Sequence, residues 1–136
     1  MLYDKTYEWD FSKFVPQVVC INLGTNDTST TGADPDLLLK GYKDLYAKVR
    51  KSYPKAKIVL LCGSMMRGET DLPMAKAAMD QCMRDAHSAG DKEVYRFDFT
   101  PQNGDLGFGA SWHPSYKQHE KMAGELTPYL KKLMNW

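Results

Sequence analysis

The sequence predicts an α/β fold in which helices flank a parallel β-sheet. Two short, almost continuous apolar runs, residues 17–23 and 58–62, each end at a glycine. Such runs are typical of strands that are covered on both faces. A segment with helical apolar spacing follows each run. Strands that alternate with helices form parallel units with right-handed crossovers, so we expect functional groups outside the carboxyl ends of the strands.

The first helix is predicted from Pro35 to about Ser52. Asp34 is a favourable N-cap, and Pro35 fits the first helical position. Pro54 ends the helix, because the residue before a proline avoids helical geometry. The apolar face of this helix consists of Leu38, Tyr42, Leu45 and Val49.

A second helix is predicted to begin at Pro73 and to end at Gly90, with a third strand at 93–97. The last helix begins at Ser115, which forms a capping-box pair with Gln118 after a glycine-rich loop. The predicted apolar stripe of the second helix consists of Ala75, Ala78, Met79, Cys82 and Ala86. The predicted apolar side of the last helix consists of His119, Met122, Ala123, Leu126, Leu130 and Leu133.

The strand at 17–23 is too apolar for the exposed edge of a sheet. We therefore expect it to be a central strand with a second neighbour, and three strands alone make a small sheet. No repeat or linker divides the chain, so residues 1–136 are expected to form a single domain. The fold class that follows is a three-layer α/β sandwich with a parallel sheet between helices, in which the strand at 17–23 needs a further partner.

Composition excludes several classes of function. The chain has 136 residues with 18 Lys and Arg against 17 Asp and Glu, so it has no basic surplus for nucleic acid. No apolar stretch approaches the roughly 20 residues that cross a bilayer, and the N-terminus has no apolar signal core. Cys20, Cys62 and Cys82 have no metal-ligand spacing with the histidines and are expected to be small buried thiols. We expect neither a metal nor a cofactor.

Residues Gly24-Thr25-Asn26-Asp27 stand where the first strand turns into a loop. Gly24 permits a tight turn, and the side-chain amide of Asn26 can donate a hydrogen bond to an oxyanion. Asp27 is expected to hold the loop rather than to act as a base. The alternative is an ordinary turn, because loops commonly use these residue types.

His113 is the candidate general base, because it lies in a loop, before Pro114 and directly before a capped helix. His87 and His119 are expected to be structural, His87 at a helix C-terminus and His119 on the core side. Ser64 follows a strand but lacks the Gly-x-Ser-x-Gly elbow of a nucleophile. Trp112 is expected either to form a wall of an acyl or sugar pocket or to pack within the fold.

Two blocks of the sequence together resemble the SGNH (GDSL-type) hydrolases. Residues 18–27 resemble their third block, Gly-x-Asn-Asp, and residues 109–115 resemble their fifth block, Asp-x-x-His-Pro. The segment 9–14 and the run Trp-His-Pro-Ser are most similar to carbohydrate esterase family two, whose members deacetylate xylan and related polysaccharides. The resemblance implies an SGNH, flavodoxin-like sandwich, of which this chain is the C-terminal part.

The resemblance also implies roles for individual residues. Asn26 would be an oxyanion donor and His113 the base, with substrate-binding roles for Gly24, Thr25, Asp27 and Trp112. The family's Gly-Asp-Ser nucleophile block has no counterpart here, so we expect the chain alone to be inactive unless a partner segment supplies the serine. The position of the triad acid is Ala110; some family members use a Ser-His dyad with a backbone carbonyl instead. Asp98 or Asp105 could also reach the imidazole.

The resemblance implies an acetylated polysaccharide as substrate and an extracellular or periplasmic location. Three alternatives remain open. The chain could belong to a lipase or acyl-thioesterase of the same superfamily, or to a carbohydrate-binding remnant without catalysis. An exposed strand edge could also pair with a second copy of the chain.

Overall fold

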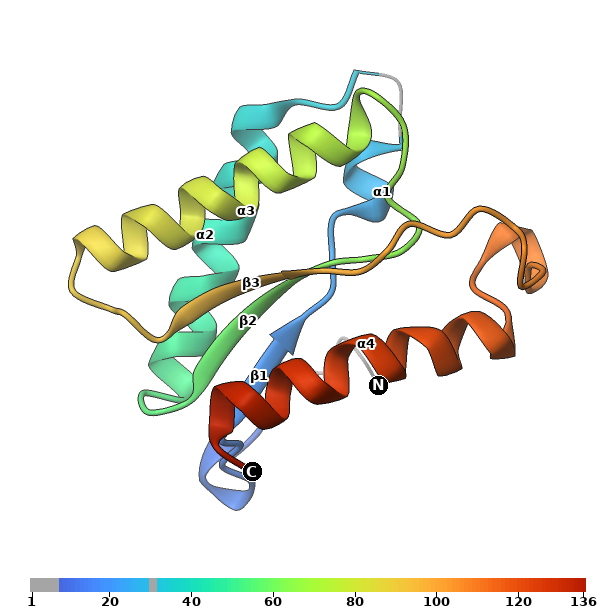
Figure 1. Cartoon of the computed structure of the whole chain (residues 1–136). Helices are drawn as coiled ribbons and strands as arrows, with labels where there is room; N and C mark the ends of the chain where they lie inside the picture. The colour runs from blue at the N-terminus through green and yellow to red at the C-terminus, as the bar shows by residue number, and fades with distance from the viewer. Residues whose placement is uncertain (1–7, 30–31) are drawn as a thin grey trace.

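The computed structural model describes residues 8–29 and 32–136 as a three-layer arrangement around one parallel sheet (Figure 1). The strands, in the spatial order β1-β2-β3, are β1 Val18–Ile21, β2 Lys57–Cys62 and β3 Val94–Asp98. The helices are α1 Thr25–Thr28, α2 Pro35–Ser52, α3 Asp71–Ser88 and α4 Tyr116–Met134. Helices α2 and α3 cover one face of the sheet and α4 covers the other, which confirms the predicted fold class.

Alternation along β2 divides the core into two parts. Ile58, Leu60 and Cys62 pack with the buried side chains of α2 and α3, whereas Val59 and Leu61 pack with the apolar side of α4. Successive side chains of a strand point to opposite faces, so a central strand with apolar residues at every position requires a helical layer on each side. The burial of all five residues confirms that the run at 58–62 is a doubly covered strand.

The helix boundaries follow the capping signals closely. Asp34 accepts hydrogen bonds from the backbone N–H groups of Asp36 and Leu37, and Ser115 accepts one from the N–H of Gln118. Helix α3 begins at Asp71, two residues before the predicted start, because proline is tolerated anywhere in the first turn. Its predicted stripe is buried as expected.

Strand β1 has β2 as its only neighbour in the described part of the sheet. The prediction that Cys20 is buried is wrong: its thiol is exposed, because β1 is an edge strand here. Cys62 and Cys82 are buried as predicted. The second neighbour that we expect for β1 stays a prediction.

The prediction that His119 faces the core is also wrong, because its side chain is exposed. Helix α4 begins beyond the carboxyl ends of the strands, so its first turn covers no part of the sheet (Figure 1). Ala123 is exposed as well, and the covered side of α4 consists of Met122, Leu126, Tyr129, Leu130 and Leu133. Within residues 8–29 and 32–136, no helix is both long and apolar enough to cross a membrane.

Candidate active site

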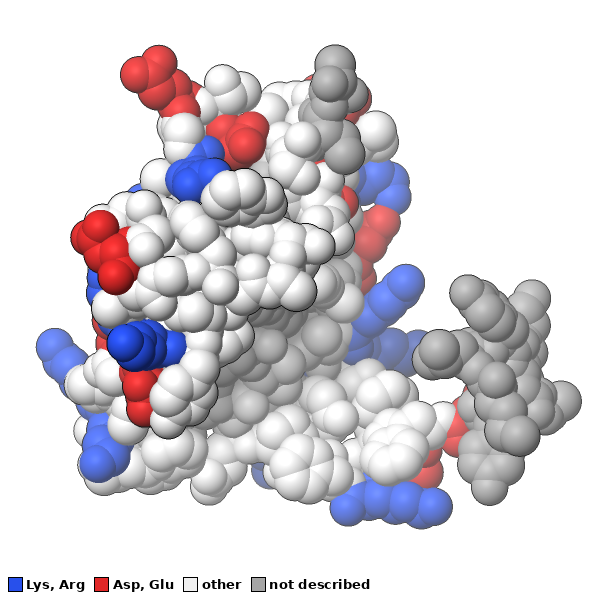
Figure 2. Space-filling model, turned by 90° about the vertical axis from the view of Figure 1, so that its right-hand side faces the viewer, with Lys and Arg blue, Asp and Glu red and all other residues white. Residues whose placement is uncertain are grey.

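A cavity of about 330 Å³ lies at the carboxyl ends of β1 and β2. The loop after β1, the loop after β2, the segment His113–Pro114 and the first turns of α4 enclose it. Its lining residues are Asn22, Leu23, Gly24, Thr25, Asn26, Asp27, Gly63, Ser64, Met65, His113, Pro114, His119 and Met122. Figure 2 views this side of the molecule, which is hollowed near its centre, with the charged side chains mostly around the margin. The two sequence blocks therefore meet in one cavity.

The loop after β1 has a fixed backbone. Gly24 has a φ of +106°, a left-handed conformation that favours glycine, and it precedes the single turn of α1. The hydroxyl of the buried Tyr42 donates a hydrogen bond of 2.6 Å to the carbonyl oxygen of Leu23. Burial raises the pKa of Tyr42, so the hydroxyl remains a protonated donor. Helix α2 thus holds the turn that presents Asn26.

We expect Gly24→Ala to lower the free energy of unfolding by about 1–3 kcal/mol. The added Cβ would lie 2.6 Å from the Tyr42 hydroxyl, and the positive φ would strain any other residue. Urea denaturation checks this result. Gly124→Ala is the matched control, because its Cβ would meet nothing within 4 Å in the middle of α4. That substitution should stabilise the chain by up to about 1 kcal/mol, and equal stability of the two variants would contradict the account.

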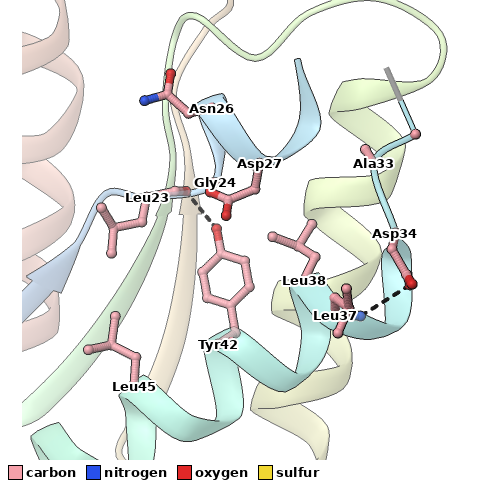
Figure 3. Close-up of a pocket in the computed structure, with 12 residues that line it drawn as sticks. Leu23, Gly24, Asn26, Asp27, Ala33, Asp34, Leu37, Leu38, Tyr42 and Leu45 are labelled. Carbon is pink, nitrogen blue, oxygen red and sulfur yellow. Dashed lines mark hydrogen bonds between the residues drawn. The ribbon is translucent and has the colours of Figure 1, made fainter. Parts of the chain in front are cut away.

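Asn26 and Asp27 are neighbours in α1, but they point to different sides (Figure 3). Asp27 points toward Tyr42, whereas Asn26 points away from it and its side chain is exposed. The amide of Asn26 is therefore free to meet a molecule in the cavity that contains His113. Gly24 and Thr25 line the same cavity, as does Asp27.

His113 is oriented by a backbone carbonyl. Its Nδ1 lies 2.9 Å from the carbonyl oxygen of Ala110, and its backbone N–H donates to the same oxygen at 3.0 Å. A carbonyl oxygen can only accept, so this hydrogen bond places the ring proton on Nδ1. Nε2 then carries the free lone pair, which is the arrangement of a general base.

Neither aspartate that was considered as a triad acid bonds to His113. Asp98 forms ion pairs with Lys76 and Arg96, and Asp105 accepts a hydrogen bond from the side chain of Asn103. The carbonyl of Ala110, at the position of the family's acid, is the group that contacts Nδ1. Among the described residues, Nδ1 of His113 thus has a backbone carbonyl rather than a carboxylate as its hydrogen-bond partner.

Trp112 and Ser64 are placed differently from His113. The side chain of Trp112 is 67% exposed and packs its ring against Phe108, with 5.2 Å between the ring centroids. Trp112 is not among the described residues that line the cavity. Ser64 lines it but is buried, and its hydroxyl contacts the sulfur of Met122 at 3.3 Å.

Three residues that shape this site were not predicted to do so from the sequence. Asn22 and His119 line the cavity, and Tyr42 holds the loop that carries Asn26. The apolar spacing of the last helix suggested a core position for His119. Its actual position follows from where α4 begins relative to the sheet, which the spacing does not indicate. Tyr42 was identified as a core residue, but no signal in the sequence indicated its hydrogen bond.

A larger cavity, of about 570 Å³, lies on the other side of the same loop. Its wall is mostly apolar and includes Leu23, Leu37 and Leu38, with Asp27 at one side (Figure 3). It contains no histidine and no nucleophilic serine or cysteine among its described lining residues. Of the two cavities, the smaller one is therefore the one in which the described residues place a histidine next to Asn26.

The described residues include no group of three or more His, Cys, Asp or Glu side chains that could hold a metal ion. Burial raises the pKa of the Cys62 thiol, and it raises that of Cys82 to about 11. Both groups therefore remain uncharged thiols near neutral pH, which makes them poor nucleophiles.

Comparison with protein families matches residues 4–126 to the family described as GDSL-like Lipase/Acylhydrolase. Among curated proteins, the chain is 44% identical over 128 residues to cellulase/esterase CelE of Acetivibrio thermocellus, covering 94% of this chain and 16% of that protein. It is 27% identical over 129 residues to an acetylxylan esterase / glucomannan deacetylase of Cellvibrio japonicus, covering 95% and 34%, respectively.

Solved structures show the same relationship. A family two carbohydrate esterase from Clostridium thermocellum, in complex with cellohexaose, matches with a TM-score of 0.91 and 42% identity over 97% of this chain and 40% of that chain. A family two carbohydrate esterase from Cellvibrio japonicus matches with a TM-score of 0.81 and 27% identity over 95% and 36%. The chain thus spans less than half the length of each of these relatives, and the resemblance seen in the two sequence blocks is confirmed.

Proposed function

The chain belongs to the GDSL-like Lipase/Acylhydrolase family, and from this membership and the geometry of the smaller cavity we propose that it forms the C-terminal part of a carbohydrate O-acetyl esterase. The observation that carries the proposal is the convergence of His113 and Asn26 on one cavity, with Nδ1 of His113 bonded to a backbone carbonyl. The similarity to family two carbohydrate esterases supports an acetylated polysaccharide as the substrate class.

In this proposal, Nε2 of His113 takes the proton of a serine hydroxyl while the serine oxygen attacks the acetyl carbonyl. The amide of Asn26 donates to the oxyanion that develops on the carbonyl oxygen. As the bond between the acetyl carbon and the sugar oxygen breaks, His113 gives the proton to that oxygen, and the acetyl group stays on the serine. Water then attacks the acetyl-serine and gives a proton to His113, which returns it to the serine oxygen as acetate leaves. The serine belongs to a segment outside these 136 residues, which would also pair with β1.

A chimera tests the proposal. In it, the 136 residues replace the matching segment of the Clostridium thermocellum esterase, so that the rest of that domain supplies the serine. We expect the chimera to release acetate from acetylated xylan or glucomannan, and the 136-residue chain alone to hydrolyse p-nitrophenyl acetate no faster than buffer does. Turnover by the chain alone would contradict the proposal, as would a folded chimera that releases no acetate.

A lipase or acyl-thioesterase of the same superfamily is the second candidate. The apolar cavity of about 570 Å³ beside Asn26 favours it, because a long acyl chain would need such a wall. The rates of the chimera on p-nitrophenyl acetate and octanoate separate the two candidates. We expect acetate to be preferred; a preference for octanoate would favour the lipase.

A further inference from the structure

Two glutamines are buried near the loop that carries His113, and neither lines the candidate active site. Gln102 follows β3 and is 7% exposed, and Gln118 lies in the first turn of α4 and is 3% exposed. Nε2 of Gln102 donates to the carbonyl oxygen of Trp112 at 2.8 Å. Nε2 of Gln118 has no hydrogen-bond partner among the described residues. Gln102 is thus tied to the residue that precedes His113, whereas the amide of Gln118 is not.

The turn that ends at His113 has an unusual backbone. Ser111 and Trp112 both have positive φ, 51° and 63°, although neither is glycine. Left-handed conformations at such residues are unfavourable and persist when the surrounding structure holds them in place. The carbonyl that Gln102 contacts belongs to the peptide between Trp112 and His113, so this bond constrains the direction in which the His113 side chain leaves the backbone.

Gln102 is itself well anchored. Its backbone N–H donates to the carbonyl oxygen of Ser64 at 2.8 Å, just beyond the end of β2. Its Oε1 has no hydrogen-bond partner among the described residues. A buried amide oxygen without a partner lowers stability, and an apolar side chain of similar size would avoid that loss. The side-chain N–H that donates to the carbonyl oxygen of Trp112 is therefore the reason for a glutamine at this position.

We propose that Gln102 is a positioning residue for His113: it fixes the Trp112–His113 peptide so that Nδ1 stays on the Ala110 carbonyl and Nε2 faces the cavity. The inference rests on the proposed function, because it assigns Gln102 a part in the same reaction. Gln102 does not contact the reacting atoms. It links the end of β2 to the loop of the base.

Nitrogen-15 NMR of the His113 imidazole in the 136-residue chain tests the inference without any turnover. We expect the parent to carry its ring proton on Nδ1, and Gln102→Met to raise the share of the Nε2–H form severalfold. Gln102→Asn is the second variant, to be used if the methionine variant does not fold. It keeps an amide but is one methylene shorter, so it should raise the share of the Nε2–H form in the same way. Gln118→Met is the matched control and should keep the tautomer of the parent.

An unchanged tautomer in a folded Gln102 variant would overturn the inference, and so would an equal change in Gln118→Met. In the chimera, Gln102→Met should lower kcat about tenfold with little change in KM, since small displacements of a catalytic group are costly. Loss of thermal stability without this loss of kcat would indicate a purely structural role and would also overturn the inference. A chimera without activity whose NMR results hold would count against the proposed function alone.

Discussion

Replacement of His113 by alanine is expected to lower kcat of the chimera at least about 10³-fold, because it removes the proposed acceptor of the serine proton. In the structure, Nδ1 of His113 is held by the Ala110 carbonyl, and the ring lines the same cavity as Asn26. The measurement is the initial rate of p-nitrophenyl acetate hydrolysis over a range of substrate concentrations. KM should change little, since the imidazole acts on the proton rather than on the bound sugar.

Two additions make this result specific. Free imidazole added to the His113→Ala chimera should restore part of the rate, because the vacated space opens into the cavity. His87→Ala is the control: its Nε2 lies 2.8 Å from the carbonyl oxygen of Val94, at the opposite end of the sheet. The assignment of His113 would be wrong if both alanine variants lost the same activity.

Replacement of Asn26 is expected to give the second largest loss. Asn26→Ala removes the side-chain donor and should lower kcat of the chimera by about 10²–10³, equivalent to roughly 3–4 kcal/mol of transition-state stabilisation. Asn26→Asp keeps the shape of the side chain but places a carboxylate where an oxyanion develops. It should be at least as damaging, and the same kinetic assay measures both.

The split between kcat and KM is the informative result for Asn26. An oxyanion donor acts on charge that appears in the transition state, so kcat should fall while KM stays close to the parent value. Asn26 is exposed on a single helical turn, so its replacement should leave the melting temperature almost unchanged. A rise in KM at constant kcat would instead make Asn26 a ground-state contact to the substrate.

Local signals predicted most of the fold. Three elements form where short-range sequence signals predict them. These signals are the aspartate and proline at the start of α2, the serine that caps α4 and the apolar run of β2. The positions of Cys20 and His119 depend instead on where an element lies within the sheet. These positions depend on whether β1 has a second neighbour and on where α4 begins relative to the strands. Both are features of the tertiary structure, which short sequence patterns do not predict.

The candidate site likewise has residues that local sequence predicts and residues that only tertiary contacts bring to it. The two sequence blocks predict His113 and Asn26 as the catalytic candidates, because glycine turns and a histidine in a loop have recognisable local chemistry, and the structure brings both residues to one cavity. The support around them was not visible in the sequence. The bond from Tyr42 to Leu23 spans 19 residues, and that from Gln102 to Trp112 depends on two left-handed residues that are not glycine. Such contacts follow from tertiary packing.

Covalent labelling of the chimera with a fluorophosphonate, read by intact mass and peptide mapping, shows which serine is the nucleophile. We expect one adduct, on a serine of the segment that the esterase relative supplies, and none on the 136-residue chain alone. His113→Ala should slow the labelling strongly. An adduct on Ser64 or on any other serine within the 136 residues would contradict the claim that this chain provides the base and the oxyanion donor to a nucleophile from outside it.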